Sequence, residues 1–162
     1  MGYNYSTKNY DKENMARVVG RSLPISTKFS VEVCSFIRNK TTSEAKAILE
    51  RVKEVKQAIP FKRYKKDLSH KRKIGPGRYP KKVAIEVIKL LESVEANAQF
   101  KGLNTSNLYI SHINAHLASR PWHYGRKRRR QMKRTTVEVI VVEQAEAKKE
   151  SKGKEAKKEA KK

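Results

Sequence analysis

Cysteine is almost absent from this chain of 162 residues, in which Cys34 is the only one. A single thiol excludes an internal disulfide framework and a cysteine-rich zinc site. Long apolar runs are also missing, because the two longest, Val83 to Leu91 and Val137 to Val142, are interrupted or too short to span a bilayer. The N-terminus has no apolar leader. We therefore expect a soluble, cytoplasmic protein that crosses no membrane.

Acidic residues are scarce as well. Asp and Glu number 16 against 39 Lys and Arg, so the formal net charge is +23. Such a surplus indicates a polyanionic partner. Hydrophobic residues still make up 37% of the chain, which is enough for one compact core, and a wholly disordered chain is not expected.

The positive charge is concentrated in three segments. Residues 60–82 hold ten Lys or Arg and one acid, residues 120–134 hold eight and none, and residues 145–162 hold eight Lys and four Glu. The other 106 residues carry a net charge of only +2. A nearly neutral body therefore presents two basic loops and a charged tail, an arrangement suited to phosphate contacts.

Three helices are predicted from apolar residues that recur every three or four positions. The first follows Ser26, which can cap it, and places Cys34 beside its apolar stripe. The second follows Thr41, which is expected to form a capping box with Glu44. The third and most regular one spans residues 80–102, with a proline in its first turn and a glycine after its last.

Three strands complete the expected fold. Residues 16–23 are predicted to form a short one, and residues 108–117 and 136–142 form two more on either side of the second basic segment. The succession of elements favours the α+β class over alternating βαβ units. We predict three helices packed on a small antiparallel three-stranded sheet, with a long protruding β-hairpin.

The domain layout follows from these elements. Residues 1–15 are expected to be an N-terminal arm that orders only on a partner, and residues 16–144 a single domain. Within that domain lie a basic insertion at 57–79 and an extended hairpin at 108–142. The Lys/Glu/Ala-rich tail at 145–162 has no apolar residue larger than Ala, so we expect it to be disordered.

Both basic loops interleave aromatic rings with cations. Each ring, Phe61 included, is expected to stack on a base, which suits irregular RNA with splayed bases better than a smooth DNA groove. One basic run alone would be as typical of a solvated face or a localisation signal as of an RNA-binding loop. Two runs, each with aromatic rings, favour RNA binding. The predicted RNA-binding residues are Lys62, Arg63, Tyr64, Lys65, Lys66, Lys71, Arg72, Lys73, Arg78, Lys81, Lys82, Arg120, Trp122, His123, Tyr124, Arg126, Lys127, Arg128, Arg129, Arg130, Lys133 and Arg134.

Signals for catalysis or metal binding are weak. His112 and His116 are four residues apart, which on a strand is about 13 Å, and they are interpreted as satisfied or surface histidines. Cys34 is interpreted as a small core residue rather than a nucleophile. Residues 75–78 lack the GK[ST] element of a phosphate loop and are predicted to form a turn. We expect no catalytic residue, no metal and no cofactor.

Five short motifs, in this order along the chain, carry a resemblance to a known family. They are Pro60 to Tyr64, Gly77 to Lys82, Asn97 to Leu103, Ile110 to His116, and Gly125-Arg126 followed by Thr136 to Val139. With them the chain resembles, over about residues 12–144, the family of large-subunit ribosomal protein twenty-two in its archaeal and eukaryotic form. The basic insertion also resembles that branch and is absent from the short bacterial form.

The resemblance implies a non-enzymatic structural constituent of the large ribosomal subunit that supports its assembly in the cytoplasm. Its partners would be large-subunit ribosomal RNA, several domains of which it would bridge, and neighbouring large-subunit ribosomal proteins. The nascent polypeptide would be a third partner, because the hairpin would line the peptide exit tunnel. The alternative is a free RNA-binding factor or an RNA-processing enzyme.

Overall fold

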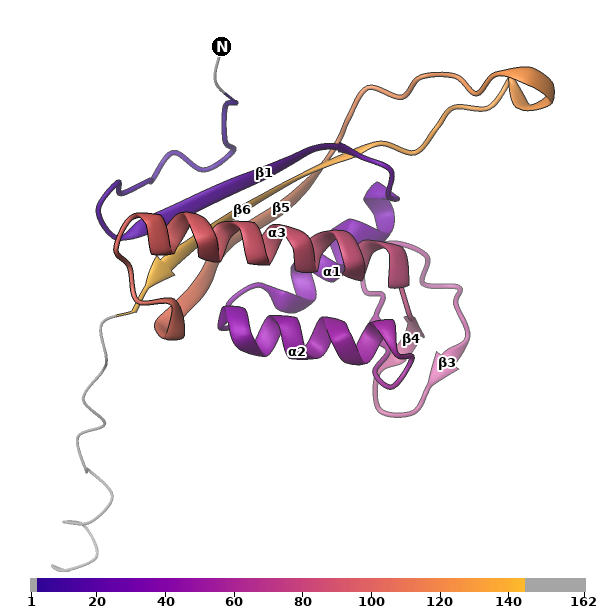
Figure 1. Cartoon of the computed structure of the whole chain (residues 1–162). Coiled ribbons are helices and arrows are strands. Elements are labelled where there is room, and N and C mark those ends of the chain that lie inside the picture. Colours follow the sequence, from indigo (N-terminus) through magenta and orange to yellow (C-terminus); the bar gives the residue numbers. More distant parts are fainter. Residues whose placement is uncertain (1–2, 145–162) are drawn as a thin grey trace, which may run out of the picture.

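A computed structural model describes residues 3–144, and the expected disordered tail lies outside this range (Figure 1). Within the described part, three α-helices, six strands and two short 3-10 helices follow one another along the chain. They are β1 (Met15–Leu23), α1 (Thr27–Ile37), α2 (Thr42–Lys53), β2 (Ile59–Pro60), β3 (His70–Lys71), β4 (Gly75–Arg78), α3 (Lys81–Phe100), η1 (Thr105–Asn107), β5 (Leu108–Leu117), η2 (Gly125–Lys127) and β6 (Thr135–Glu143).

The main sheet has three antiparallel strands in the order β1-β6-β5. Val139 of the central strand β6 pairs with Val18 of β1 on one side and with Ile113 of β5 on the other. Helix α3 packs on β1, α1 packs on β5, and α2 packs on α3, so the helices cover one face of the sheet (Figure 1). The predicted α+β class is confirmed.

The hydrophobic core lies between the main sheet and the helices. Val137, Val139 and Val141 reach it from alternate positions of β6 and are all fully buried, as the period of a strand requires. Cys34 is only 1% exposed, so it belongs to the buried stripe of α1 rather than lying beside it. Phe29, at the start of the same helix, is only half-buried at the edge of the core.

The ends of α2 and α3 follow local sequence signals, whereas Ser26 precedes α1 without forming the expected side-chain cap. The Oγ1 atom of Thr41 accepts the N–H of Glu44 at 3.2 Å, as predicted. The capping box is only half formed, because the Glu44 carboxylate pairs with Lys40 at 2.6 Å. Pro80 is the N-cap of α3, and Gly102 follows its last turn with a φ of 78°, a conformation that glycine adopts without steric cost.

The basic insertion folds into a second small sheet, where the sequence predicted an irregular loop. Its strands pair antiparallel in the order β2-β4-β3. Phe61, next to this sheet, is 1% exposed and packs edge-on against Phe29 with the ring centroids 5.1 Å apart. The prediction that Phe61 stacks on a base is therefore wrong, because its ring attaches the insertion to α1.

The N-terminal arm lies against the outer face of the main sheet. The Ser6 N–H donates to the Glu138 carboxylate of β6 at 3.1 Å. The Lys101 ammonium donates to the Tyr10 hydroxyl at 2.7 Å, and the Arg17 guanidinium lies 4.3 Å from the centroid of the same ring. In the structure β1, β6 and the end of α3 supply contacts to the arm, while its ordering on a partner stays a prediction.

Strands β5 and β6 continue into a hairpin that projects past the helices (Figure 1). Beyond the paired strands the two arms remain joined by main-chain hydrogen bonds. The Ala118 N–H donates to the Arg134 carbonyl at 3.2 Å, and the Met132 N–H donates to the Pro121 carbonyl at 2.8 Å. These bonds hold the projecting part as two antiparallel arms without any core of its own.

Candidate nucleic-acid interface

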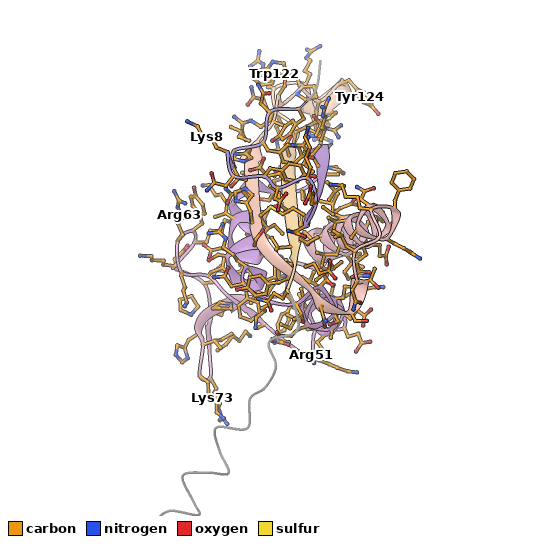
Figure 2. All side chains as sticks on the ribbon, turned by 90° about the vertical axis from the view of Figure 1, so that its left-hand side faces the viewer. Lys8, Arg51, Arg63, Lys73, Trp122 and Tyr124 are labelled. Carbon is orange, nitrogen blue, oxygen red and sulfur yellow. The ribbon has the colours of Figure 1, made fainter. Side chains whose placement is uncertain are left out.

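The hairpin loop, residues 118–134, presents cations and rings to solvent. It holds eight Lys or Arg and no acid. Trp122 is 60% exposed and Tyr124 is 88% exposed, and Figure 2 shows both at one end of the molecule. The tip turns at Gly125, whose φ is 63°, and continues into the short helix η2. Exposed aromatic faces beside guanidinium groups are the elements of base stacking and phosphate binding.

The predicted hairpin residues differ in exposure. Arg134 is partly buried at the base of the loop, where its guanidinium donates to the Ser22 carbonyl at 3.1 Å and ties the loop to β1. His123 is also partly buried. The exposed members are Arg120, Trp122, Tyr124, Arg126, Lys127, Arg128, Arg129, Arg130 and Lys133.

A buried carboxylate holds the start of the basic insertion. Glu32 of α1 is 3% exposed and accepts the main-chain N–H groups of Lys62, Arg63 and Tyr64 at 3.0, 2.9 and 2.6 Å. Hydrogen bonds to an ionised acceptor are stronger than neutral ones, and three of them satisfy the buried charge. With the backbone held in this way, Lys62 and Arg63 are exposed and free to meet a partner.

The turn between β3 and β4 forms a second cationic tip. Figure 2 shows Lys73 at the end of the molecule opposite to Trp122 and Tyr124, so the structure does not gather the predicted residues into one patch. The Lys71 ammonium is partly buried, 5.8 Å from the centroid of the Tyr79 ring. Tyr64 is also partly buried, and the exposed members of this group are Lys62, Arg63, Lys65, Lys66, Arg72, Lys73, Arg78, Lys81 and Lys82.

The two basic segments meet at the base of the hairpin. There Lys65 of the insertion lines the same hollow as Arg120, Lys133 and Arg134 of the hairpin. Lys133 also lines a second hollow beside the start of α3. Cations far apart in the sequence thus line the same hollow, although the tips of the two loops lie at opposite ends of the molecule.

Five acidic side chains of the body lie on α2 and α3. Several are neutralised locally: the Lys46 ammonium lies 2.5 Å from the Glu95 carboxylate, and Lys89 lies 3.5 Å from Glu86. The surplus positive charge is therefore left on the two basic loops. The acids on these two helices are Glu44, Glu50, Glu86, Glu92 and Glu95.

His112 and His116 converge on one buried carboxylate. Their Nε2 atoms lie 2.8 and 3.1 Å from Oε1 of Glu138, which is fully buried. Glu138 pairs opposite Asn114, halfway between the two histidines, so both imidazoles reach it although four residues separate them. Ser6 of the arm donates to the same carboxylate from its hydroxyl as well as its N–H. The interpretation of these histidines as satisfied side chains is confirmed.

The Glu138 cluster predicts acid-sensitive stability. Burial by itself would raise the pKa of Glu138, but hydrogen bonds from His112, Ser6 and His116 outweigh it and lower the pKa from 4.5 to about 2. A carboxyl with a lower pKa in the folded state stabilises the fold above its unfolded-state pKa. The contribution of this group to the free energy of unfolding should therefore disappear as the pH falls from about 5 toward about 2.

Urea unfolding of the wild type and of Glu138→Gln at a series of pH values tests this contribution. The wild type should be the more stable protein above about pH 5, and the difference should shrink toward about pH 2. A difference of the same size at every pH would contradict the assignment.

Cys34 has the environment of a packing residue. Burial raises the pKa of its thiol to about 12, so the nucleophilic thiolate is scarce at neutral pH. The interpretation as a core residue is confirmed.

Over residues 3–144 no group of three or more His, Cys, Asp or Glu side chains is placed to hold a metal ion. No helix in that part of the chain is long and apolar enough to cross a membrane.

A family model described as ribosomal protein L22p/L17e matches residues 18–144. The match covers all three helices, both basic loops and the main sheet apart from the first three residues of β1. The chain belongs to this family. The resemblance drawn from the five sequence motifs is thereby confirmed, while the whole N-terminal arm precedes the matched span of the L22p/L17e family.

Archaeal relatives of the L22p/L17e family are similar over most of their length. A protein of Archaeoglobus fulgidus is 43% identical over 145 residues, which cover 85% of this chain and 94% of the relative. One of Methanoculleus marisnigri is 43% identical over 141 residues, covering 82% and 92%. One of Methanopyrus kandleri is 39% identical over 150 residues, covering 87% and 94%. All three are named large ribosomal subunit protein uL22.

Three features of this L22p/L17e member were missed by the sequence patterns. Glu32 carries no local signal, because the N–H groups that it accepts lie 30 to 32 residues away. Lys28 lines one hollow at the hairpin base and Phe29 lines two, although Phe29 is an apolar residue at the start of α1. The one sequence signal for the partial exposure of the Phe29 ring is its position in the first turn of α1, where the helix reaches the edge of the core.

Proposed function

We propose that the protein is a structural constituent of the large ribosomal subunit that binds large-subunit ribosomal RNA. The observation that carries this proposal is the hairpin loop, which holds eight cations, two exposed rings and no acid on an arm without a core. Lys and Arg contacts release counterions from the RNA, while the folded body determines where the loop points. Membership of the L22p/L17e family supports the same conclusion.

The basic insertion is proposed to bind a second stretch of ribosomal RNA. Its cationic tip lies at the other end of the molecule from the hairpin tip (Figure 2). One rigid body with cations at both ends can hold together RNA segments that repel each other, which supports assembly of the subunit. In this proposal residues 16–144 act as one ribosome-binding domain, and the predicted RNA-binding residues in both loops make the contacts.

The hairpin tip is proposed to reach the peptide exit tunnel and to meet the nascent polypeptide. A projection that is held as two antiparallel arms, with Tyr124 exposed at its end, suits insertion between RNA walls better than packing on its own body. The protein would then reside on cytoplasmic ribosomes, with neighbouring large-subunit proteins beside its less basic helical side. It has no catalytic role in this proposal.

Sucrose-gradient sedimentation at physiological salt separates this proposal from its rival. A structural constituent should co-sediment almost wholly with large subunits. A free RNA-binding factor or RNA-processing enzyme would use Trp122, Tyr124 and the arginines only transiently and would remain mostly in the soluble fractions. Recovery of most of the protein in those soluble fractions would contradict the proposed structural role.

A further inference from the structure

Two adjoining hollows lie at the base of the hairpin and form one groove, which we call the basal groove. Their volumes are about 430 and 320 Å³, and both are lined by Ser26, Phe29 and Lys133. Phe29 lines both parts of the groove, which spans the starts of α1 and α3, the insertion and the hairpin base.

The first hollow has an apolar floor and a cationic rim. Ile25, Pro80 and Val83 contribute apolar surface together with the ring of Tyr79. Lys81, Lys82 and Lys133 also line it, and all three side chains are exposed. An apolar floor with a ring beside ammonium groups suits a flat aromatic base attached to a phosphate.

The second hollow is lined by cations and hydroxyl groups together with the apolar side chains of Phe29 and Leu117. Lys28 of α1 and Lys65 of the insertion face it together with Arg120, Lys133 and Arg134 of the hairpin. The Lys65 ammonium lies 5.5 Å from the centroid of the Phe29 ring, and this ring lines the first hollow as well. No acid lines either hollow. The charge of the groove is thus complementary to a chain of phosphates.

The N-termini of two helices add to the positive electrostatic potential of the groove. Both α1 and α3 begin beside the groove, and neither Ser26 nor Pro80 forms a side-chain cap with the first N–H groups. Uncapped helix N-termini carry partial positive charge. This contribution supplements the seven Lys and Arg side chains, which are the main attraction for an anion.

We propose that the basal groove binds an unpaired segment of ribosomal RNA. One base enters the first hollow, and the adjoining phosphates follow the second hollow toward the hairpin. A double helix is recognised by its outer shape and keeps its bases stacked inside it, whereas an unpaired base is free to enter the hollow and stack. The inference rests on the proposed function and specifies which kind of RNA segment binds at the basal groove.

A bound strand would also set the direction of the hairpin. The groove is lined by the insertion, by two helices and by the hairpin base, so a strand lying in it contacts all of them at once. Those contacts would hold the projecting arms against the body at the point where main-chain pairing becomes sparse.

Photo-cross-linking of the full chain to oligouridine of about twelve nucleotides, with one 4-thiouridine, tests the position of the strand. Cross-links to Phe29 or Tyr79 are expected in the wild type. They should be lost in the triple variant Lys81→Gln, Lys82→Gln and Lys133→Gln. Cross-links found only at Trp122 and Tyr124 would overturn the inference, and co-sedimentation with large subunits would in that case leave the proposed function standing.

Binding titrations with the same oligouridine and with its duplex with oligoadenine test selectivity for an unpaired strand. The triple variant should bind oligouridine about tenfold more weakly and with a salt dependence shallower by about 2 in log-log slope, since each single-strand phosphate contact contributes about 0.7. Duplex affinity should change less than about twofold. The matched control, Lys53→Gln, Lys56→Gln and Lys89→Gln, removes three exposed cations outside the groove and should alter neither probe.

Three outcomes of these titrations would overturn the groove as a single-strand site. The first is equal loss of affinity for the two probes, and the second is an equal effect of the control variant. The third concerns competition by an oligoglutamate of the same charge as the oligouridine. If it displaces labelled oligouridine at the same concentration as unlabelled oligouridine does, the occupant would be an acidic protein segment.

Discussion

Replacing Arg126, Arg128, Arg129 and Arg130 together by Gln should weaken binding to large-subunit ribosomal RNA about 100-fold near physiological salt. The four side chains are half of the cations in the hairpin loop and all are exposed. Each phosphate contact contributes about 0.7 to 0.9 to the log-log salt dependence, so the slope should become shallower by about 3. Filter binding over a salt series measures both quantities.

The same four substitutions should leave the fold intact. None of these side chains lies in the core, and the loop is joined to the body through the ends of β5 and β6 and through the hydrogen bond from Arg134 to Ser22, which involves none of the four. Far-ultraviolet circular dichroism should therefore show unchanged helix content and the same urea midpoint. Loss of the helical signal would contradict the division into a neutral body and a basic appendage.

A matched variant separates local contact from total charge. Arg51, Lys53, Lys56 and Lys89 are four exposed cations of the helical side, and Figure 2 shows Arg51 at the end opposite to Trp122 and Tyr124. Replacing all four by Gln lowers the net charge by the same amount. We expect it to reduce RNA affinity less than about threefold. An effect equal to that of the hairpin variant would mean that only net charge matters.

Replacing Glu32 by Ala should destabilise the protein by about 3 kcal/mol, because it leaves three N–H groups without their ionised acceptor and empties a buried space. The N–H groups belong to Lys62, Arg63 and Tyr64, so the start of the insertion should loosen first. Urea unfolding measures the loss of stability. Hydrogen exchange at the three amides should become much faster than in the wild type.

Two comparisons make the Glu32 prediction specific. Glu32→Gln keeps the shape and one carbonyl acceptor, so it should be destabilised about half as much. Glu50→Ala removes an exposed acid from α2 and should change stability by less than about 0.5 kcal/mol. Unchanged exchange at the amides of residues 62–64 in Glu32→Ala would show that the carboxylate does not hold the insertion.

Most of the main fold could be predicted from local pattern. Residues of α3 recur on one face with the period of a helix, and Val137, Val139 and Val141 alternate with the period of a strand, because burial of one face imposes that period directly on the sequence. The two basic loops could be located for a related reason. Unpaired cations are too costly to bury, so a run of them in a chain of this size has to lie on the surface.

Other features depended on which distant residues meet. Phe61 and Tyr64 lie in one motif, yet the first ring is fully buried against Phe29 and the second is only partly buried. The sequence alone determined that this chain is a neutral α+β body with two basic loops. Only the tertiary structure decided that Glu32 holds the insertion, that Glu138 joins two histidines to the arm, and that the loops meet at the basal groove. Those contacts join residues 22 to 132 positions apart, and a periodic pattern records only whether a side chain is buried, never its partner.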